Sequence, residues 1–225
     1  MSIQENYEKI KLNIKKACEK SRRKAEDVTI LAVTKTRSAD EINEAIALGI
    51  TDIGENRVQE LLSKYDDVSK NVRWHIIGHL QTNKVKYIAD KVSMIHSVDS
   101  FRLALEINSR CEKLSKVMDI LIEINSGEEN KDGIDVQNAD ELIKEISRLE
   151  NVRIRGLMTM APLGADEETL RRVFTNLKNL SVDIEAKKYD NVDMNVLSMG
   201  MSGDYETAIE CGSTLIRPGR SLFGI

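Results

Sequence analysis

The chain has 225 residues, of which 33 are Lys or Arg and 37 are Asp or Glu, so its formal net charge is −4 at pH 7. Charges of both signs are mixed along the chain, and no basic face of the kind that binds nucleic acid stands out. The length fits one α/β domain with a sizeable core, and no run is long or apolar enough to cross a membrane.

The N-terminal segment and the cysteines indicate the cellular compartment of the protein. Residues 1–24 mix charged side chains with apolar ones at helical spacing, and they lack the continuous apolar core of a signal peptide. Cys18, Cys111 and Cys211 are widely spaced and form no Cys-x-x-Cys pair. This argues against a disulfide framework or a structural zinc site. We therefore expect a cytoplasmic protein with an amphipathic N-terminal helix.

The rest of the chain alternates short apolar runs with segments of helical periodicity. The apolar runs predict strands at 29–34, 51–54, 73–77, 94–98, 118–124, 152–158, 195–197 and 214–217. Helical patterns lie between them at 39–48, 58–65, 82–89, 101–114, 139–149, 167–180 and 203–211. The spacing of about 28 residues per unit is typical of a (β/α)8 barrel of the TIM type. We predict one such α/β domain over residues 1–225 with an extra N-terminal helix, and an open doubly wound sheet is the alternative.

Polar or reactive residues stand at the ends of nearly all the predicted strands. They are Lys35, residues 55–57, residues 78–79, Ser97, Asn125, residues 159–160, residues 198–199 and Arg217. In a barrel these ends converge on one rim, where the βα loops build the active site. A lysine at the mouth of a buried strand can be desolvated, and its free amine can then form a Schiff base with a carbonyl. Taken alone, however, Lys35 also fits a surface lysine that merely follows a strand.

The loops after the last two strands are typical of a phosphate site. Phosphate is held by backbone N–H groups at a helix start, with glycines allowing close approach and a hydroxyl completing the shell. Ser202 and Gly203 precede a predicted helix, and Gly219 and Arg220 follow the eighth strand. These loops occupy the usual phosphate position of a TIM barrel. In isolation the same residues fit ordinary turns, with Ser202 as a helix N-cap.

Arg217, at the end of the last strand, is expected to point into the site. A guanidinium is protonated and only donates hydrogen bonds, so it would keep a facing pyridine nitrogen unprotonated. This weakens such a ring as an electron sink. His75 and His79 are four residues apart but lack the Glu of a metalloprotease helix, so we expect no metal site, and we expect a structural role for His96.

Six stretches give the chain a resemblance to a known family. They are AVTK at 32–35, GENRVQE at 54–60, WHIIGHLQ at 74–81, GLMTMAP at 156–162, SMGMSGDYE at 198–206 and RPGRSLFG at 217–224. With these motifs, spread over nearly the whole chain, the sequence closely resembles the pyridoxal phosphate homeostasis proteins of the YggS/PROSC type. Those proteins share the fold of the alanine racemase N-terminal barrel.

The resemblance implies a site for pyridoxal 5'-phosphate (PLP). It implies that Lys35 is the Schiff-base lysine and that Arg217 faces the pyridine nitrogen. It also implies that Ser202, with the backbone around Gly219 and Arg220, holds the phosphate.

Three further residues complete the comparison with the family. Asn56 falls in the family's rim motif near the cofactor. Met199 is counted as a cofactor-binding residue because a polarizable side chain suits a flat ring, although the methionines would also suit a core. Where racemase barrels read Gly-Leu-Tyr-Thr-His, with a ring-stacking histidine, this chain has Met160. The racemases also continue beyond the position of Ile225 into a β-rich domain with a catalytic tyrosine. Both differences argue against racemase catalysis.

We therefore expect a PLP-binding barrel that holds the cofactor on Lys35 and serves its homeostasis as a carrier or buffer. No catalytic residue and no metabolic turnover are expected. The expected partners are PLP and apo forms of PLP-dependent enzymes, with no nucleic acid or membrane, and the expected state is a monomer or weak dimer. Two alternatives stay open: a small PLP-dependent amino-acid racemase or decarboxylase, and a class I aldolase that uses Lys35 on a sugar phosphate without Arg217.

Overall fold

The computed structural model describes residues 1–127 and 132–224. Within these residues eight parallel strands close into a barrel in chain order, because β1 pairs with both β2 and β8. The strands are β1 (Thr29–Val33), β2 (Asp52–Glu55), β3 (Arg73–Ile76), β4 (Met94–Val98), β5 (Met118–Glu123), β6 (Val152–Met158), β7 (Val192–Met201) and β8 (Leu215–Arg217). The predicted (β/α)8 barrel is confirmed, and the open sheet is wrong.

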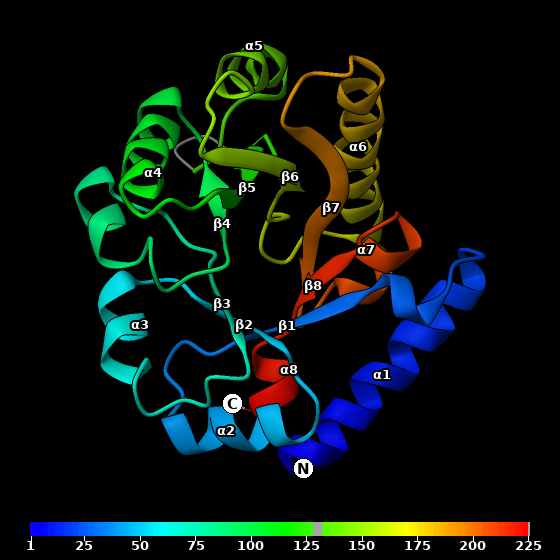
Figure 1. Cartoon of the computed structure of the whole chain (residues 1–225). Coiled ribbons are helices and arrows are strands. Elements are labelled where there is room, and N and C mark those ends of the chain that lie inside the picture. The colour runs from blue at the N-terminus through cyan, green and yellow to red at the C-terminus, as the bar shows by residue number, and fades with distance from the viewer. Residues whose placement is uncertain (128–131, 225) are drawn as a thin grey trace.

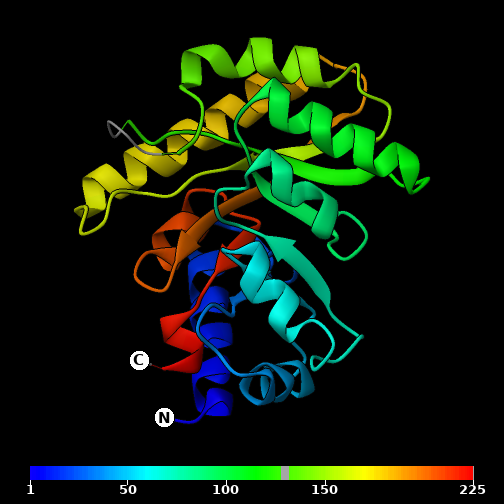
Figure 2. The ribbon, with the colours of Figure 1, turned by 90° about the vertical axis from the view of Figure 1, so that its left-hand side faces the viewer.

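Helices follow the strands and surround the barrel, as Figures 1 and 2 show from two directions. In the described ranges the α-helices are α1 (Ile3–Lys20), α2 (Ala39–Ala47), α3 (Val58–Lys64), α4 (Phe101–Lys113), α5 (Val136–Ile146), α6 (Glu167–Ala186), α7 (Tyr205–Glu210) and α8 (Arg220–Phe223). Short 3-10 helices occur at η1 (Ala25–Asp27) and η2 (Thr82–Tyr87). No helix of the described segments combines the length and the apolar character needed to span a bilayer.

Several elements differ from what the sequence pattern predicts: η1 and α8 were not predicted, α6 extends beyond the predicted 167–180, and β7 and η2 differ in length or type. β7 runs from Val192 to Met201, well beyond the predicted 195–197, because pairing with β6 and β8 extends it across polar residues that carry no hydrophobic signal. The segment predicted as a helix at 82–89 forms a 3-10 helix, in which Val85 is the buried residue and no side chain caps the start. In both places tertiary contacts override the local pattern.

The strands separate two apolar clusters, because successive side chains of a strand point to opposite faces. The larger cluster packs the outer faces of the strands against the helices and includes Ala32 and Ile53. The smaller cluster consists of the buried residues Leu31, Val33, Ile77 and Leu215, with Val196 packed against it. Polar side chains occupy much of the remaining interior, at Asp52, His75, His96, Ser198 and Arg217, all between 0% and 3% exposed.

The N-terminal helix α1 packs beside α7 and α8. It begins at a capping box, in which Ser2 and Glu5 bond each other's backbone N–H groups. Further along, Asn6 donates to the carbonyl oxygen of Leu222, at 3.0 Å, and Asn13 donates to the hydroxyl of Tyr205, at 2.9 Å. The predicted extra helix therefore braces the two helices that follow the last strands.

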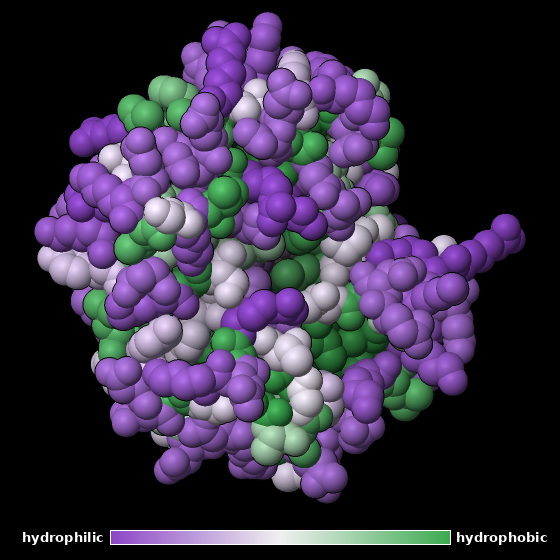
Figure 3. Space-filling view, in the orientation of Figure 1, coloured by the Kyte–Doolittle hydropathy of each residue, from purple (hydrophilic) through white to green (hydrophobic). Residues whose placement is uncertain are grey.

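Figure 3 shows the molecule in the orientation of Figure 1, coloured by hydropathy. Hydrophilic side chains cover most of this face. Near its middle lies a hollow where hydrophobic and hydrophilic side chains both reach the surface. The face is thus polar at its periphery and mixed where it is hollowed.

Candidate functional site

The carboxyl ends of β7, β8 and β1 lie side by side and bring the main predicted site residues onto one rim. Met201 pairs with Arg217 in the strand register. The N–H of Val33 donates to the carbonyl oxygen of Pro218, at 3.0 Å. A Cβ added to Gly219 would lie 3.3 Å from Cβ of Val33, so that loop packs directly on β1. Lys35 therefore follows a strand that touches the loop after Arg217.

Ser202 is the point where the loops after β7 and β8 meet. Its Oγ accepts the N–H of Gly219 at 3.1 Å and the N–H of Ser221 at 3.0 Å, and it lies 3.2 Å from the hydroxyl of Ser221. We call Ser202, Gly219 and Ser221 the cradle. Sequence reasoning assigned no role to Ser221, although it directly follows the Gly-Arg pair that was singled out. Donors that converge on one oxygen are typical of a phosphate site.

The turn between β7 and α7 positions Ser202. Gly200 has a φ of +96°, and a Cβ there would lie 2.7 Å from Cβ of Ala208 and 2.9 Å from Cα of Tyr205. Only glycine can adopt this positive φ without strain and also leave the space that a Cβ would fill. The carboxylate of Asp204 accepts the N–H of Met201 and closes the turn. Burial raises the pKa of Asp204, although the backbone bond from Met201 and the charge of Arg217 act in the opposite direction.

Lys35 lies exposed on the rim rather than enclosed by it, so the desolvation expected from the sequence is not observed. The next residue, Thr36, has a φ of +63°, which is unusual for a β-branched residue. Its N–H donates to the carboxylate of Glu60, and the N–H of Arg37 donates to the carbonyl oxygen of Thr34 at 3.0 Å. These bonds hold the tight turn that presents Lys35.

A partly buried ion cluster packs against this turn on the side of α3. Nζ of Lys64 donates to Glu55 at 2.9 Å, to Glu60 at 2.7 Å and to the carbonyl oxygen of Thr34 at 2.9 Å. Glu55 also accepts from the hydroxyl of Thr34, at 2.7 Å, while its Oε2 has no hydrogen-bond partner among the described residues. Burial raises the pKa of Glu55, against the bonds from Lys64 and Thr34. The cluster ties β1 and β2 to α3 below Lys35.

Arg217 lies inside the mouth of the barrel and is 3% exposed. Nη1 donates to the hydroxyl of Ser198 at 2.6 Å, and Nη2 donates to the carbonyl oxygen of Thr159 at 2.9 Å. Burial lowers the pKa of Arg217 to about 10, and the nearby carboxyl groups of Glu123 and Asp204 oppose this shift. The guanidinium therefore stays charged at neutral pH and is fixed by two acceptors.

Below Arg217 the interior polar residues form a continuous hydrogen-bonded line. Oγ of Ser198 lies 2.9 Å from Nδ1 of His96, and Nε2 of His96 lies 2.9 Å from Nδ1 of His75. Nε2 of His75 lies 2.9 Å from Oδ1 of Asp52. At the far end Arg73 binds both carboxylate oxygens of Asp52, at 2.8 and 2.7 Å. His75 and His96 are thus bonded to each other, and within the described residues no group of His, Cys, Asp or Glu is arranged to hold a metal ion.

Glu123, the last residue of β5, is a site residue that sequence reasoning missed. It is 3% exposed, and burial raises its pKa to about 7, with Asp132 and Asp99 adding to the effect and Arg217 opposing it. An acidic residue between the apolar Ile122 and Ile124, near the end of the predicted strand 118–124 and two positions after Leu121 on the same strand face, is the signal that would have found it. Glu123 places a group that titrates near neutral pH at the mouth.

The other predicted site residues are spread around the rim. Asn56 follows β2 and is partly buried, with its backbone packed where a Cβ on Gly78 would lie. Arg220 is exposed at the start of α8. Met199 is 0% exposed and belongs to the core between barrel and helices, because Ser198 takes the inward position. The structure therefore does not bring the Met199 side chain to the cradle. Met160 is 37% exposed at the mouth.

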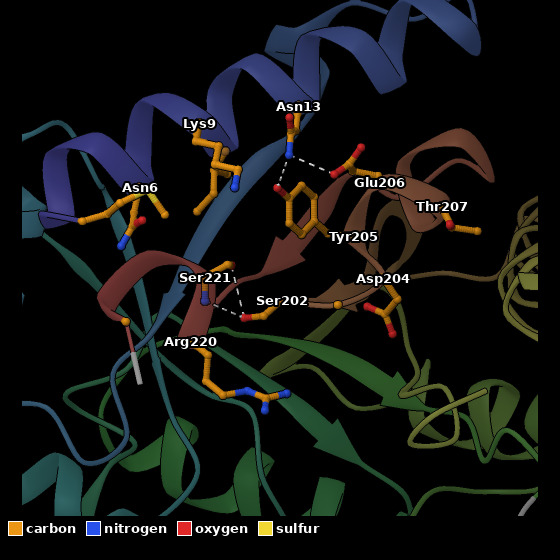
Figure 4. Close-up of a pocket in the computed structure, with 14 residues that line it drawn as sticks. Asn6, Lys9, Asn13, Ser202, Asp204, Tyr205, Glu206, Thr207, Arg220 and Ser221 are labelled. Atoms are coloured by element: carbon orange, nitrogen blue, oxygen red, sulfur yellow. Dashed lines mark hydrogen bonds between the residues drawn. The ribbon is translucent and has the colours of Figure 1, made fainter. Parts of the chain in front are cut away.

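A cavity of about 590 Å³ adjoins the cradle on the side of α1. Its lining residues are Met1, Asn6, Lys9, Ile10, Asn13, Ser202, Gly203, Asp204, Tyr205, Glu206, Thr207, Arg220, Ser221 and Gly224. Figure 4 shows that Asn6, Lys9 and Asn13 project from α1 toward the side of Ser202 and Ser221. The cradle is therefore reached from the space between α1, α7 and α8 as well as from the barrel mouth.

Comparison with known proteins gives matches over nearly the whole chain. The family model described as alanine racemase, N-terminal domain, matches residues 6–225. A pyridoxal phosphate homeostasis protein of Aquifex aeolicus is 42% identical over 226 residues, which cover 100% of this chain and 98% of that protein. A protein of the same name from Escherichia coli K12 is 35% identical, over 99% of this chain and 96% of its own length.

Solved structures agree with the sequence matches. The crystal structure of an unknown protein from Bifidobacterium adolescentis has a TM-score of 0.94 at 35% identity, covering 98% of this chain and 94% of that one. PipY of Synechococcus elongatus, with PLP bound, has a TM-score of 0.87 at 30% identity, covering 99% and 100%. A Clostridium difficile alanine racemase, 18% identical with a TM-score of 0.75, covers 98% of this chain and 56% of its own, and shares the fold. The chain belongs to the alanine racemase N-terminal domain family, and within it the chain is similar over nearly its full length to proteins named pyridoxal phosphate homeostasis proteins.

Proposed function

We propose that the protein binds PLP at the carboxyl end of its barrel, with the aldehyde joined to Lys35 as a Schiff base and the phosphate held by the cradle. Residues 1–225 would act as one PLP-binding domain that carries or buffers the cofactor in the cytoplasm, as a monomer or weak dimer. The matches with pyridoxal phosphate homeostasis proteins and with PLP-bound PipY, over nearly their full lengths, support this role.

The cradle is the observation that carries the proposal. Two backbone N–H groups and a hydroxyl converge within 3.2 Å of one side-chain oxygen, that of Ser202. When the Ser202 side chain rotates about χ1 and its Oγ leaves this position, a phosphate oxygen there would receive the N–H groups of Gly219 and Ser221, and the rotated hydroxyl could donate to it. The residues present therefore fit a phosphate monoester.

The position of Arg217 favours storage of the cofactor over reaction at an amino-acid substrate. PLP supplies an aldehyde that bonds reversibly to amines and a pyridine ring that can act as an electron sink. Arg217 offers the ring nitrogen hydrogen-bond donors only, so it leaves that nitrogen unprotonated and weakens the sink. Met160, at the mouth, has a thioether that cannot carry a proton. We therefore propose that no metabolic turnover accompanies binding.

The exposure of Lys35 supports the role of a carrier. A lysine on the open rim leaves its bond to an aldehyde within reach of water and of incoming amines. Transfer to a lysine of an apo-enzyme needs such access, whereas a closed active site excludes it. We propose apo forms of PLP-dependent enzymes as the recipients.

One observation favours the alternative of a small PLP-dependent enzyme. Glu123 sits at the mouth with a pKa raised to about 7, chiefly by burial, and such a group can take up and release a proton at neutral pH. A racemase or decarboxylase would use a proton carrier of this kind beside Lys35. The class I aldolase alternative has no comparable support, since it gives the buried Arg217 no task.

Borohydride trapping tests the proposal. The purified protein is mixed with PLP, its visible spectrum is recorded before and after borohydride, and the modified peptide is identified by mass spectrometry. The adduct should lie on Lys35, and Lys35→Arg, which keeps the charge but cannot form a Schiff base, should abolish it. Lys9→Arg, in the cavity beside the cradle, is the matched control and should keep it. A trapped adduct on another lysine of the wild type would contradict the assignment.

A further inference from the structure

The polar line through the barrel core is too complete to be an incidental packing feature. Ser198, His96, His75 and Asp52 are each between 0% and 3% exposed, and each is bonded to the next at 2.9 Å. Buried polar groups are costly unless every donor meets an acceptor. The four hydrogen bonds from Arg217 to Asp52 must therefore be mutually consistent.

The lower end of the line sets the direction of the bonds. Burial acts to raise the pKa of Asp52, but hydrogen bonds from His75 and Arg73 outweigh it, so the pKa of Asp52 lies well below its usual range. An ionised carboxylate only accepts, and His75 must therefore donate from Nε2. In a neutral His75 this leaves Nδ1 as an acceptor, which requires a hydrogen on Nε2 of His96.

The upper end imposes the same direction independently. Arg217 only donates, so the hydroxyl oxygen of Ser198 accepts from Nη1. The hydroxyl of Ser198 has no other hydrogen-bond acceptor among the described residues, so it gives its single hydrogen to Nδ1 of His96, which is then unprotonated. Burial holds the pKa of His96 well below its usual range, and the positive charge of Arg217 adds to the effect. Both ends thus select one tautomer for each histidine, with the hydrogen on Nε2.

The line joins two separate openings of the barrel. Asp52 and His75 line a cavity of about 240 Å³ at the amino ends of the strands. The charged groups around it are Asp52, Arg73, Asp119 and Arg155, and the His75 ring also faces it. At the other end Arg217 faces the mouth, near Glu123 and Asp204.

We propose that His75 and His96 are positioning residues for Arg217: with Ser198 they form a directional chain that holds the guanidinium in one arrangement and couples it to the Asp52 carboxylate across the core. A change at Asp52 then alters the affinity for a ligand that contacts Arg217. The effect on PLP affinity rests on the proposed function, whereas the tautomers of the two histidines do not.

Nitrogen-15 NMR of histidine-labelled protein, without added PLP, tests the chain directly. Long-range nitrogen–proton correlations distinguish the two neutral tautomers and the charged ring. Both His75 and His96 should be neutral with the hydrogen on Nε2 at pH 7, and exposed His79 serves as the internal reference. A hydrogen on Nδ1 of either buried ring, or a charged His96, would overturn the proposal.

A matched pair of variants tests the coupling. Asp52→Asn replaces a carboxylate that can only accept by a neutral amide that can also donate to His75. Asp119→Asn makes the same charge change in the same cavity outside the chain. Coupled sites typically differ by about fivefold or more in affinity, so Asp52→Asn should raise the Kd for PLP by about that factor, while Asp119→Asn leaves it unchanged. Asp52→Asn should also mix the tautomers of His75. Equal Kd values for both variants would overturn the coupling. If the wild type bound no PLP, the proposed function would fail. The NMR measurement of the two tautomers would still show whether the directional hydrogen-bonded chain exists.

Discussion

The amide nitrogen of Gly219 lies 3.1 Å from the hydroxyl oxygen of Ser202, although the two residues are 17 positions apart in the chain. This bond joins the loops after β7 and β8, and the same Gly219 packs on Val33 of β1. A phosphate held in the cradle is therefore positioned relative to the strand that carries Lys35.

Ser202→Ala should weaken PLP more than it weakens pyridoxal, which has no phosphate. One hydrogen bond to a charged group contributes about 1.5–3 kcal/mol, so the loss for PLP should be tenfold or more. Spectrophotometric titration with both ligands measures it. Ser213→Ala, which removes a buried hydroxyl that donates to the carbonyl oxygen of Met199 at 2.7 Å, controls for general loosening. Equal losses for PLP and pyridoxal would mean that Ser202 only stabilises the loops.

Gly200→Ala should destabilise the protein, because the new Cβ would clash with Ala208 and Tyr205 at a positive φ. Overpacking of this kind costs about 1–3 kcal/mol in the free energy of unfolding. Gly203→Ala is the matched change in the same loop, where a Cβ meets nothing within 4 Å, and should stay within about 0.5 kcal/mol of the wild type. Urea denaturation compares the two. Similar losses for both would show that the turn at Gly200 adapts.

Glu123 should make stability depend on pH. Its pKa rises from 4.5 to about 7 in the folded protein, so the folded state binds the proton more tightly than the unfolded state does. The free energy of unfolding should therefore be greatest below about pH 4.5 and fall as the pH rises through about 7, by up to ~3 kcal/mol. Glu123→Gln should remove this fall and be more stable than the wild type at pH 8.

The measurement is urea denaturation of both proteins at several pH values between 4 and 8. Glu112→Gln, on an exposed position of α4, controls for the loss of one negative charge. A wild-type stability that rises over this range relative to Glu123→Gln would show that the carboxyl is ionised in the folded protein.

The PLP-loaded protein should not exchange the α-hydrogen of L- or D-alanine with solvent deuterium. On the proposed function, Arg217 would weaken the ring as an electron sink, and the Met160 thioether cannot carry a proton. Proton NMR of either alanine with excess loaded protein in deuterated buffer is the measurement. Exchange with inversion would favour the racemase, and its loss in Glu123→Gln would identify the proton carrier.

Sequence periodicity predicted the barrel and most strand bounds, because each strand is a short apolar run between polar turns. It predicted only residues 195–197 of β7, because polar residues such as Asp193 interrupt the apolar pattern and pairing with β6 and β8 defines the full strand. Motifs led to Lys35, Ser202 and Arg217, because those residues end strands or follow them. The sequence did hold a signal for Glu123, an acidic residue in an apolar run, although not for its burial. The partners of His96 could not be predicted, because contacts between distant strands leave no local sequence signal.

The barrel closes through the hydrogen bond between Val33 and Pro218, so the site can form only after both ends of the chain have been synthesised. During synthesis the N-terminal part leaves the ribosome first, and contacts between residues far apart in the chain form late. Lys35 is therefore exposed to the cell long before Gly219 and Ser221 are made. On the proposed function, a nascent chain has the amine that would bind PLP but lacks the cradle, so cofactor loading has to wait until the loop after β8 has emerged.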